Sequence, residues 1–191
     1  MKRIAIVGDI GSGKSFVAKK FKYPIFNADE EVNKIYNKNK FCFRKLKKIL
    51  PKFIHTFPIN KVNIANAILK NNKNLKKIIN IIHPEVRHRM NMFLKKNKKK
   101  NFVILDIPLF LENKLNKKND ILVFVDSNKK EILKRLKRRK NFNLKLFKIL
   151  LKFQLPLEIK KKKSTYILKN NFTEKTIKNN IIKIIKKIQN D

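Results

Sequence analysis

One segment near the start of the chain constrains the fold more than any other feature. It fits the pattern G-x-x-x-x-G-K-[ST] and reads Gly8-Asp9-Ile10-Gly11-Ser12-Gly13-Lys14-Ser15. An apolar run at residues 4–7 precedes it and helical spacing follows from residue 14 to residue 21, so a strand and a helix are expected on either side. In this context the pattern indicates a loop that binds the phosphates of a nucleoside triphosphate.

Glycine usage strengthens this interpretation. The chain has 191 residues and only three glycines, all of them in the loop, whereas average usage is about 7%. A tight strand-to-helix turn would also use glycine, but it needs one or two. Three glycines followed by Lys-Ser favour a nucleotide site, where Lys14 would reach the β and γ phosphates and Ser15 would hold Mg²⁺. The loop alone does not identify the reaction.

Short apolar runs alternate with helical spacing along the rest of the chain. This alternation predicts an α/β fold with a parallel, doubly wound sheet. Further strands are predicted at 23–26, 102–105, 121–125 and 166–168, and helices at 128–139, 143–153 and after Thr173. Residues 29–97 are mainly helical in pattern, and Pro84 is expected to start a helix that runs to about Lys96. We expect a single domain over residues 1–191.

The formal net charge is +37, from 50 Lys+Arg against 13 Asp+Glu. Such a surface attracts polyanions whatever its fold. The basic residues are 43 lysines and seven arginines spread along nearly the whole chain, whereas recognition of bases and phosphates favours arginine. We therefore expect solvated lysine faces, with runs such as 98–100 and 160–163 at helix ends, and no specific nucleic-acid partner.

Cysteine and hydropathy patterns restrict the compartment. Cys42 is the only cysteine, so an intrachain disulfide and a cysteine-based zinc site are excluded, and a reducing cytoplasm fits. No apolar run approaches the 18 residues of a membrane span, and the four apolar residues before Gly8 are too few for the core of a signal peptide. Nothing in the sequence indicates an oligomeric state.

Two acidic residues follow predicted strands, where ligands of parallel sheets bind. Asp29 could accept the proton of an attacking hydroxyl, or it could favour a helix N-terminus together with Glu30 and Glu31. Asp106 could hold Mg²⁺ or cap the end of its strand.

Arginines are few, and three of them lie close together. Arg135, Arg138 and Arg139 are spaced at i, i+3 and i+4, which predicts one helical face. That face could border a lid that closes over ATP, or it could be a solvated basic surface. Arg87 and Arg89 could neutralise an anionic acceptor or be surface charges.

Taken in order, the motifs resemble those of the dephospho-CoA kinases, a family of P-loop kinases in the nucleoside-monophosphate-kinase group, from residue 1 to about 170. The loop is similar to the family's G-G-I-G-S-G-K-[ST]. The other matching segments are Asn27-Ala28-Asp29, Ile82-His83-Pro84-Glu85-Val86-Arg87, Asp106-Ile107-Pro108-Leu109-Phe110-Leu111-Glu112, Arg135-Leu136 with Arg139, Gln154-Leu155-Pro156-Leu157-Glu158 and Tyr166-Ile167-Leu168-Lys169-Asn170.

The resemblance implies ATP-dependent phosphorylation of the ribose 3′-hydroxyl of dephospho-CoA. It implies a three-layer fold with a parallel sheet of about five strands, a helical acceptor-binding region at 29–97 and a lid at about 135–155. The implied catalytic residues are Asp29, Lys14 and Arg139. The implied ATP-binding residues are Gly8, Gly11, Ser12, Gly13, Lys14, Ser15, Phe16, Arg135, Arg139 and Asn170. The acceptor would be bound by Asp29, His83, Arg87, Pro108 and Leu109, and Mg²⁺ by Ser15 and Asp106.

Five residues depart from the family pattern: Asp9, Phe16, Asn27, Lys140 and Thr165. Asp9 replaces the usual second glycine and adds negative charge where anions bind, so we expect weaker ATP binding if its carboxylate faces inward. Three alternatives stay open at this point: another small-metabolite or nucleotide kinase, a basic nucleic-acid-binding P-loop protein, and an inactive relative.

Overall fold

The computed structural model describes residues 1–139 and 142–190, so the departure at Lys140 lies outside the described residues. The chain divides into two compact units. The first comprises Met1–Asn27, Asn97–Phe142 and Phe153–Asp191 and contains the sheet. The second comprises Ala28–Lys96 and Asn143–Lys152 and is built from helices.

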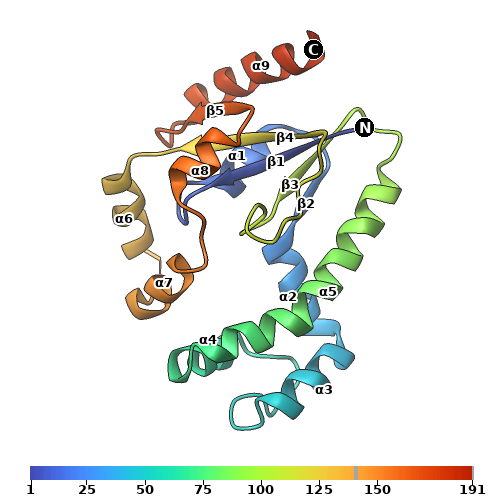
Figure 1. Ribbon diagram of the computed structural model, residues 1–191, viewed down its shortest axis with the longest axis vertical. Coiled ribbons are helices and arrows are strands. Elements are labelled where there is room, and N and C mark those ends of the chain that lie inside the picture. Colours follow the sequence, from blue (N-terminus) through green and yellow to red (C-terminus); the bar gives the residue numbers. More distant parts are fainter. Residues whose placement is uncertain (140–141, 191) are drawn as a thin grey trace. The chain divides into compact units, whose positions relative to one another are not determined.

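Within the described residues, the strands of the first unit form a five-stranded parallel sheet in the order β2-β3-β1-β4-β5 (Figure 1). They are β1 (Lys2–Gly8), β2 (Ile25–Asn27), β3 (Phe102–Asp106), β4 (Asp120–Asp126) and β5 (Tyr166–Lys169). All of β3, and β1 after its first residue, is buried, as expected for strands covered on both faces. The predicted α/β class, with a parallel sheet of about five strands, is confirmed.

Helices α1 (Lys14–Lys20), α8 (Leu157–Lys162) and α9 (Glu174–Asn190) contact the strands of this sheet. Helix α6 (Lys129–Lys137) instead places Ile132 and Leu136 beside Gly11. The buried face of α9 packs on the strands and α1 through isoleucines at helical spacing, as the sequence predicts: Ile177, Ile181, Ile184 and Ile188. For the short helix α8, only its end was predicted, from the lysine run at 160–163. Its start was not, because it has no apolar stripe of useful length.

The departure at Thr165 is accommodated at the start of β5. Its Oγ1 accepts a hydrogen bond from the backbone N–H of Leu122 at 3.3 Å. The threonine therefore joins β4 to the beginning of β5.

The second unit is organised around its longest helix. Its helices are α2 (Ala28–Lys38), α3 (Lys40–Ile49), α4 (Lys61–Lys70), α5 (Lys73–Lys96) and α7 (Leu144–Leu151). Helix α5 contacts α2, α3 and α4, and α4 also contacts α7. Asparagine side chains cap three of these helices by accepting backbone N–H groups: Asn39, Asn60 and Asn143.

The prediction that Pro84 starts a helix is wrong, because Pro84 lies inside the 24-residue helix α5. The buried face of this helix continues on both sides of the proline, through Leu75, Ile78, Ile82, Val86 and Met90. Burial of that face outweighs the cost of about 3 kcal/mol for an interior proline. Pro84 and Asn80 are both exposed, so water can reach the Asn80 carbonyl that loses its helical donor.

Candidate active site

Three predicted site residues of the first unit, Gly8, Asp106 and Asn170, lie where the parallel strands end. Gly8, Asn27, Asp106 and Asp126 are the last residues of β1, β2, β3 and β4, and Asn170 follows β5. The central strand β1 lies between β3 and β4. The connection after β1 leads to β2 on one side of it, and the connection after β3 leads to β4 on the other side. Ligands of parallel sheets bind at such a switch point.

The loop between β1 and α1 needs its glycines for two separate reasons. Gly11 and Gly13 have φ of +85° and +87°, which side chains rarely adopt. The space beside them is also filled by the protein itself. A Cβ at Gly13 would lie 2.6 Å from Asn170 Nδ2, and one at Gly11 would lie 2.9 Å from Leu136 Cγ. The glycines thus fit the loop against its own neighbours as well as suiting a phosphate ligand.

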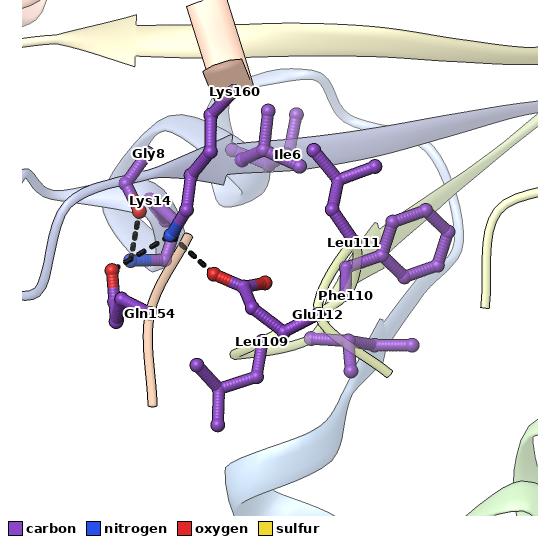
Figure 2. A pocket seen from close by; sticks show the side chains of 11 residues that line it. Ile6, Gly8, Lys14, Leu109, Phe110, Leu111, Glu112, Gln154 and Lys160 are labelled. Carbon is purple, nitrogen blue, oxygen red and sulfur yellow. Dashed lines mark hydrogen bonds and ion pairs between the residues drawn. The ribbon is translucent and has the colours of Figure 1, made fainter. Parts of the chain in front are cut away.

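Lys14 is the first residue of α1 and folds back over the loop. Its ammonium donates to the carbonyl oxygen of Asp9 at 2.7 Å and to that of Gly8 at 3.5 Å. The pocket shown in Figure 2 is lined by Lys14 and Gly8, together with Leu109 from the turn after β3. These bonds hold the ammonium at the loop.

The carboxylate of Asp9 bonds within the loop. Its Oδ1 accepts the backbone N–H of Ile10 at 2.7 Å, and its carbonyl oxygen accepts the N–H of Ser12 at 3.2 Å. The Asp9 side chain therefore satisfies the N–H group of the residue that follows it. The first N–H groups of α1, which have no acceptor within that helix, form its positive end.

Ser12 lies fully buried in the middle of the loop. Its carbonyl oxygen accepts hydrogen bonds from Asn170 Nδ2 at 2.7 Å and from Ser127 Oγ at 2.9 Å. Among the described residues, its own hydroxyl is buried without a hydrogen-bond partner. Asn170, expected to bind ATP, thus donates to the loop itself.

Asp106 ends β3 and is 3% exposed. Asn27 lies opposite it in the register between β2 and β3, and Asn27 Nδ2 donates to Asp106 Oδ2 at 2.6 Å. In the part of the chain that the structure describes, no three His, Cys, Asp or Glu residues group as metal ligands. A cation at Asp106 would therefore take most of its ligands from substrate and water.

The predicted helical face of arginines is wrong in part. Helix α6 ends at Lys137, so Arg138 caps its C-terminus and Arg139 lies beyond it, with its N–H bonded to the carbonyl of Leu136 at 3.1 Å. Positive charges are favourable at the negative C-terminal end of a helix, so arginines at these positions are as typical of a helix end as of a helix interior. Arg135 alone of the three remains within α6.

Phe172 is a residue that the sequence reasoning missed. It has φ of +63°, which is unusual for a bulky side chain. Its ring centroid lies 4.2 Å from the guanidinium of Arg135, and its Cε1 would lie 3.2 Å from a Cβ at Gly13. Strained backbone of this kind concentrates at functional sites. An aromatic residue just after Asn170 was the available signal.

A buried ion pair beside Lys14 was also missed. The Lys160 ammonium lies 2.6 Å from Glu112 Oε1 and donates to Gln154 Oε1 at 2.7 Å (Figure 2). The run 160–163 lies at the end of α8, as predicted, but Lys160 is 3% exposed, so the expected solvation is wrong for this residue. In a run of four lysines, the sequence alone does not distinguish the one that α8 turns inward.

Asp29, Glu30 and Glu31 occupy the first turn of α2, in the second unit, where acidic side chains suit the helix dipole. Glu31 pairs with Lys34 and Arg89 at 2.6 Å and 3.1 Å. Burial raises the pKa of Glu31, but the hydrogen bonds from these two cations more than offset it and hold the pKa below its usual value.

Arg89 also donates from Nε to Glu85 at 2.8 Å. Its bond to Glu31 joins α5 to α2, whereas its bond to Glu85 lies within α5. The sequence left Arg89 as an acceptor-binding cation or a surface charge, and the structure instead pairs it with Glu31 and Glu85.

His83 and Arg87 lie one turn apart on α5, so the structure brings this predicted pair together. His83 is half-buried and Arg87 is exposed. Burial lowers the pKa of His83, and the nearby charge of Arg87 lowers it further, which keeps the imidazole neutral at pH 7.

Pro108 and Leu109 form the turn after β3. Leu109 has φ of +57°, and its carbonyl oxygen accepts the backbone N–H and the Nδ2 of Asn113 at 3.0 Å and 2.8 Å. These bonds hold a strained residue at the edge of the pocket that also contains Lys14.

No helix in the described ranges is both long and apolar enough to cross a membrane.

Comparison with known proteins identifies the relatives of this chain. A family model described as dephospho-CoA kinase matches residues 2–176. The dephospho-CoA kinase of Bartonella quintana is 31% identical over 180 residues, which cover 88% of each chain.

Two solved structures resemble the whole chain. TT1252 from Thermus thermophilus has a TM-score of 0.78 at 25% identity and covers 97% of this chain and 96% of its own. A dephospho-CoA kinase from Campylobacter jejuni has a TM-score of 0.62 at 25% identity, with 98% and 97% covered.

Proposed function

The chain belongs to the dephospho-CoA kinase family, and we propose that its phosphate loop, Asp29 and Arg139 carry out that family's reaction. The enzyme phosphorylates the ribose 3′-hydroxyl of dephospho-CoA with ATP and forms CoA and ADP, the last step of CoA biosynthesis. The observation that carries the residue assignment is the preformed loop at residues 8–15. It follows β1 and is held by hydrogen bonds from Lys14 to Asp9 and from Asn170 to Ser12.

The loop would bind ATP. The amides at the start of α1, including those of Ser15 and Phe16, would donate to the phosphates, and Lys14 would contact the β and γ phosphates. The unpartnered, buried hydroxyl of Ser12 supports a ligand at this position. The Ile10 N–H group donates to the Asp9 carboxylate, which supports a loop whose backbone holds this extra carboxylate.

Mg²⁺ would be held by the Ser15 hydroxyl and Asp106. A single buried carboxylate suits this ion, which keeps several waters and takes further oxygens from phosphates. When bound, it neutralises charge on the β and γ phosphates. Asn27, by donating to Asp106, would fix the direction of the carboxylate.

Asp29 would accept the proton of the ribose 3′-hydroxyl as that oxygen attacks the γ-phosphorus. His83, Arg87, Pro108 and Leu109 would bind the acceptor, with neutral His83 as a hydrogen-bonding group and Arg87 as the partner of an anionic group. Positioning and charge stabilisation supply most of the catalysis in such transfers.

Arg135 and Arg139 would close over the nucleotide as part of a lid. The contact between Arg135 and Phe172, next to Gly13, supports a place for Arg135 beside bound ATP. Arg139 would stabilise charge on the transferring group. The reaction's small-metabolite substrates and the free thiol of Cys42 support a cytoplasmic enzyme.

One experiment tests the function. Purified enzyme is offered dephospho-CoA, AMP, CMP or shikimate with ATP and Mg²⁺, and ADP release is followed. We expect turnover with dephospho-CoA well above the other acceptors. Turnover of a different acceptor with dephospho-CoA inert would overturn the assignment.

A second experiment addresses the basic surface. Steeply salt-dependent binding to DNA or RNA, together with ATP hydrolysis stimulated by either, would favour a nucleic-acid-binding protein. We expect no such stimulation.

A further inference from the structure

The pocket beside Lys14 contains a second lysine that the assigned site does not use. Lys160 reaches it from α8, and its ammonium lies among Glu112, Gln154 and the loop residues Gly8 and Lys14 (Figure 2). At 3% exposure Lys160 is almost completely withdrawn from water. A charged group is placed in such a position at considerable cost unless something compensates it.

The protein compensates this ammonium only in part. A lysine ammonium has three N–H donors. Within the described residues, the Lys160 ammonium has two acceptors, Glu112 Oε1 at 2.6 Å and Gln154 Oε1 at 2.7 Å. One donor is therefore left for a ligand.

The ammonium is also held in place. Glu112 accepts the backbone N–H of Leu155 at 3.0 Å as well as pairing with Lys160. The backbone carbonyl of Lys160 accepts the hydroxyl of Ser164 at 2.7 Å. A cation fixed in advance stabilises developing charge without reorganisation during the reaction.

Stability alone does not account for this arrangement. A buried ion pair is replaced by well-packed apolar residues at little cost, and often with a gain in stability. A lysine kept charged next to the lysine of a phosphate loop is better explained by an anionic ligand than by packing.

The position of the pocket selects one part of that ligand. Gly8 at the end of β1 and Leu109 after β3 line it. The sheet order places β3 and β5 on opposite sides of β1, so this pocket lies on the β3 side of the loop. The proposed acceptor-binding turn, Pro108 and Leu109, lies on the same side. The phosphoryl group that faces the acceptor is the γ-phosphoryl of ATP.

We propose that Lys160 donates its third N–H to an oxygen of the γ-phosphoryl group, as a second phosphate-contacting lysine beside Lys14. Glu112 and Gln154 are then positioning residues that hold the ammonium. No proton leaves Lys160, because it stabilises charge while the phosphorus–oxygen bond to ADP breaks and the bond to the acceptor forms. The proposal rests on the proposed function, since it uses ATP as the ligand.

The test compares two nucleotides by calorimetry with Mg²⁺ present and no acceptor: ADP and a non-hydrolysable ATP analogue that keeps the γ-phosphoryl group. Lys160→Met should weaken binding of the analogue by about 10- to 100-fold, the scale of a lost charge-assisted hydrogen bond. Its affinity for ADP should change by no more than about threefold. Lys160→Arg should restore part of the difference. Lys162→Met, on the exposed side of α8, is the matched control and should leave both affinities unchanged.

The double variant Lys160→Met with Glu112→Gln removes both charges, so it decides the question if the single variant does not fold. Equal losses of ADP and analogue affinity, or no loss of either, would overturn the proposal. Failure of the proposed function is distinguishable, because it appears as wild-type enzyme that does not phosphorylate dephospho-CoA while these binding differences persist.

Discussion

Asn170 Nδ2 donates to the carbonyl oxygen of Ser12 at 2.7 Å, so the residue that follows β5 holds the middle of the phosphate loop. Asn170 Oδ1 also accepts the backbone N–H of Phe172 at 2.8 Å, and Asn170 N–H bonds to the carbonyl of Asp126 at 2.7 Å. Both polar ends of this buried side chain are used. The loop shape therefore depends on β4 and β5 as well as on its own glycines.

Replacing Asn170 should separate loop support from packing. Asn170→Ala removes the bonds to Ser12 and Phe172, so we expect the free energy of unfolding to fall by about 1–3 kcal/mol and ATP affinity to fall about tenfold. Asn170→Asp should lower ATP affinity further, because it places a carboxylate oxygen against the Ser12 carbonyl.

Urea unfolding and nucleotide calorimetry measure the two effects. Asn180→Ala, which loses only an exposed bond of 3.2 Å to the Lys169 carbonyl, serves as control. If the Ala and Asp variants bind ATP as wild type does, the loop does not depend on this contact.

Asp29 has two possible roles, in catalysis or at a helix N-terminus, and Glu30 offers a matched comparison. Both are exposed acids in the first turn of α2. We expect Asp29→Asn to lower kcat by at least about 10²-fold, the scale of a lost general base, while Glu30→Gln keeps near-normal kcat. Steady-state ADP release with dephospho-CoA gives both values. Near-normal kcat in Asp29→Asn would leave the residue its helix-stabilising role alone.

Lys14→Ala should lower kcat by a similar factor, because it removes a charge stabiliser of the transferring phosphoryl group. The matched control is Lys19→Ala in the last turn of the same helix, where the lysine is exposed. The same ADP-release assay applies. Equal losses in the two variants would point to a defect of the helix and not of the phosphate site.

Much of the fold followed from the sequence because strand and helix periods depend on local patterns. Runs of buried apolar residues ending in Gly8 and Asp106 marked β1 and β3, and Ile177 and its repeats marked α9. The loop spacing predicts a phosphate site for the same reason, since all of its residues are adjacent in the chain.

The predictions that failed depend on contacts between distant residues. Lys160 is one of four consecutive lysines, and only its contacts with Glu112 and Gln154 distinguish it from the others. Pro84 usually starts helices, but the apolar face of α5 continues through it. Phe172 adopts positive φ in contact with Arg135. The run of four lysines contains no local pattern that singles out Lys160.

Asn27 is one of the five departures from the expected family pattern, and it donates to Asp106 at 2.6 Å. Asn27→Asp would bring two carboxylates together at that distance, one of them almost fully buried. We expect the variant without metal to lose about 1–3 kcal/mol of unfolding free energy at pH 7. Mg²⁺, or a pH low enough to protonate one of the pair, should restore most of this loss.

Thermal unfolding with and without Mg²⁺, at pH 7 and pH 5, tests this expectation. Asn27→Ala removes the donor without adding charge, so its stability should not respond to Mg²⁺ in the same way. A variant Asn27→Asp as stable as wild type at pH 7 without Mg²⁺ would contradict the close contact.

The ion pairs of Arg89 predict how acid affects the helical unit. The pKa of Glu31 is lowered in the folded state, since the hydrogen bonds from Lys34 and Arg89 outweigh burial. A lowered pKa contributes stability above the unfolded value of about 4.5, and that stability is lost as pH falls through the folded pKa. Arg89→Met should therefore cost about 1 kcal/mol at pH 7 and progressively less below pH 4.5.

Urea unfolding at pH 7, 5 and 3.5 measures the difference between wild type and Arg89→Met. Arg44→Met, at an exposed site on α3, is the control. In a chain of net charge +37, loss of this arginine reduces repulsion, so its stability should be unchanged or slightly higher. A difference between Arg89→Met and wild type that stays constant from pH 7 to 3.5 would attribute the loss to packing of the arginine side chain and not to its ion pairs.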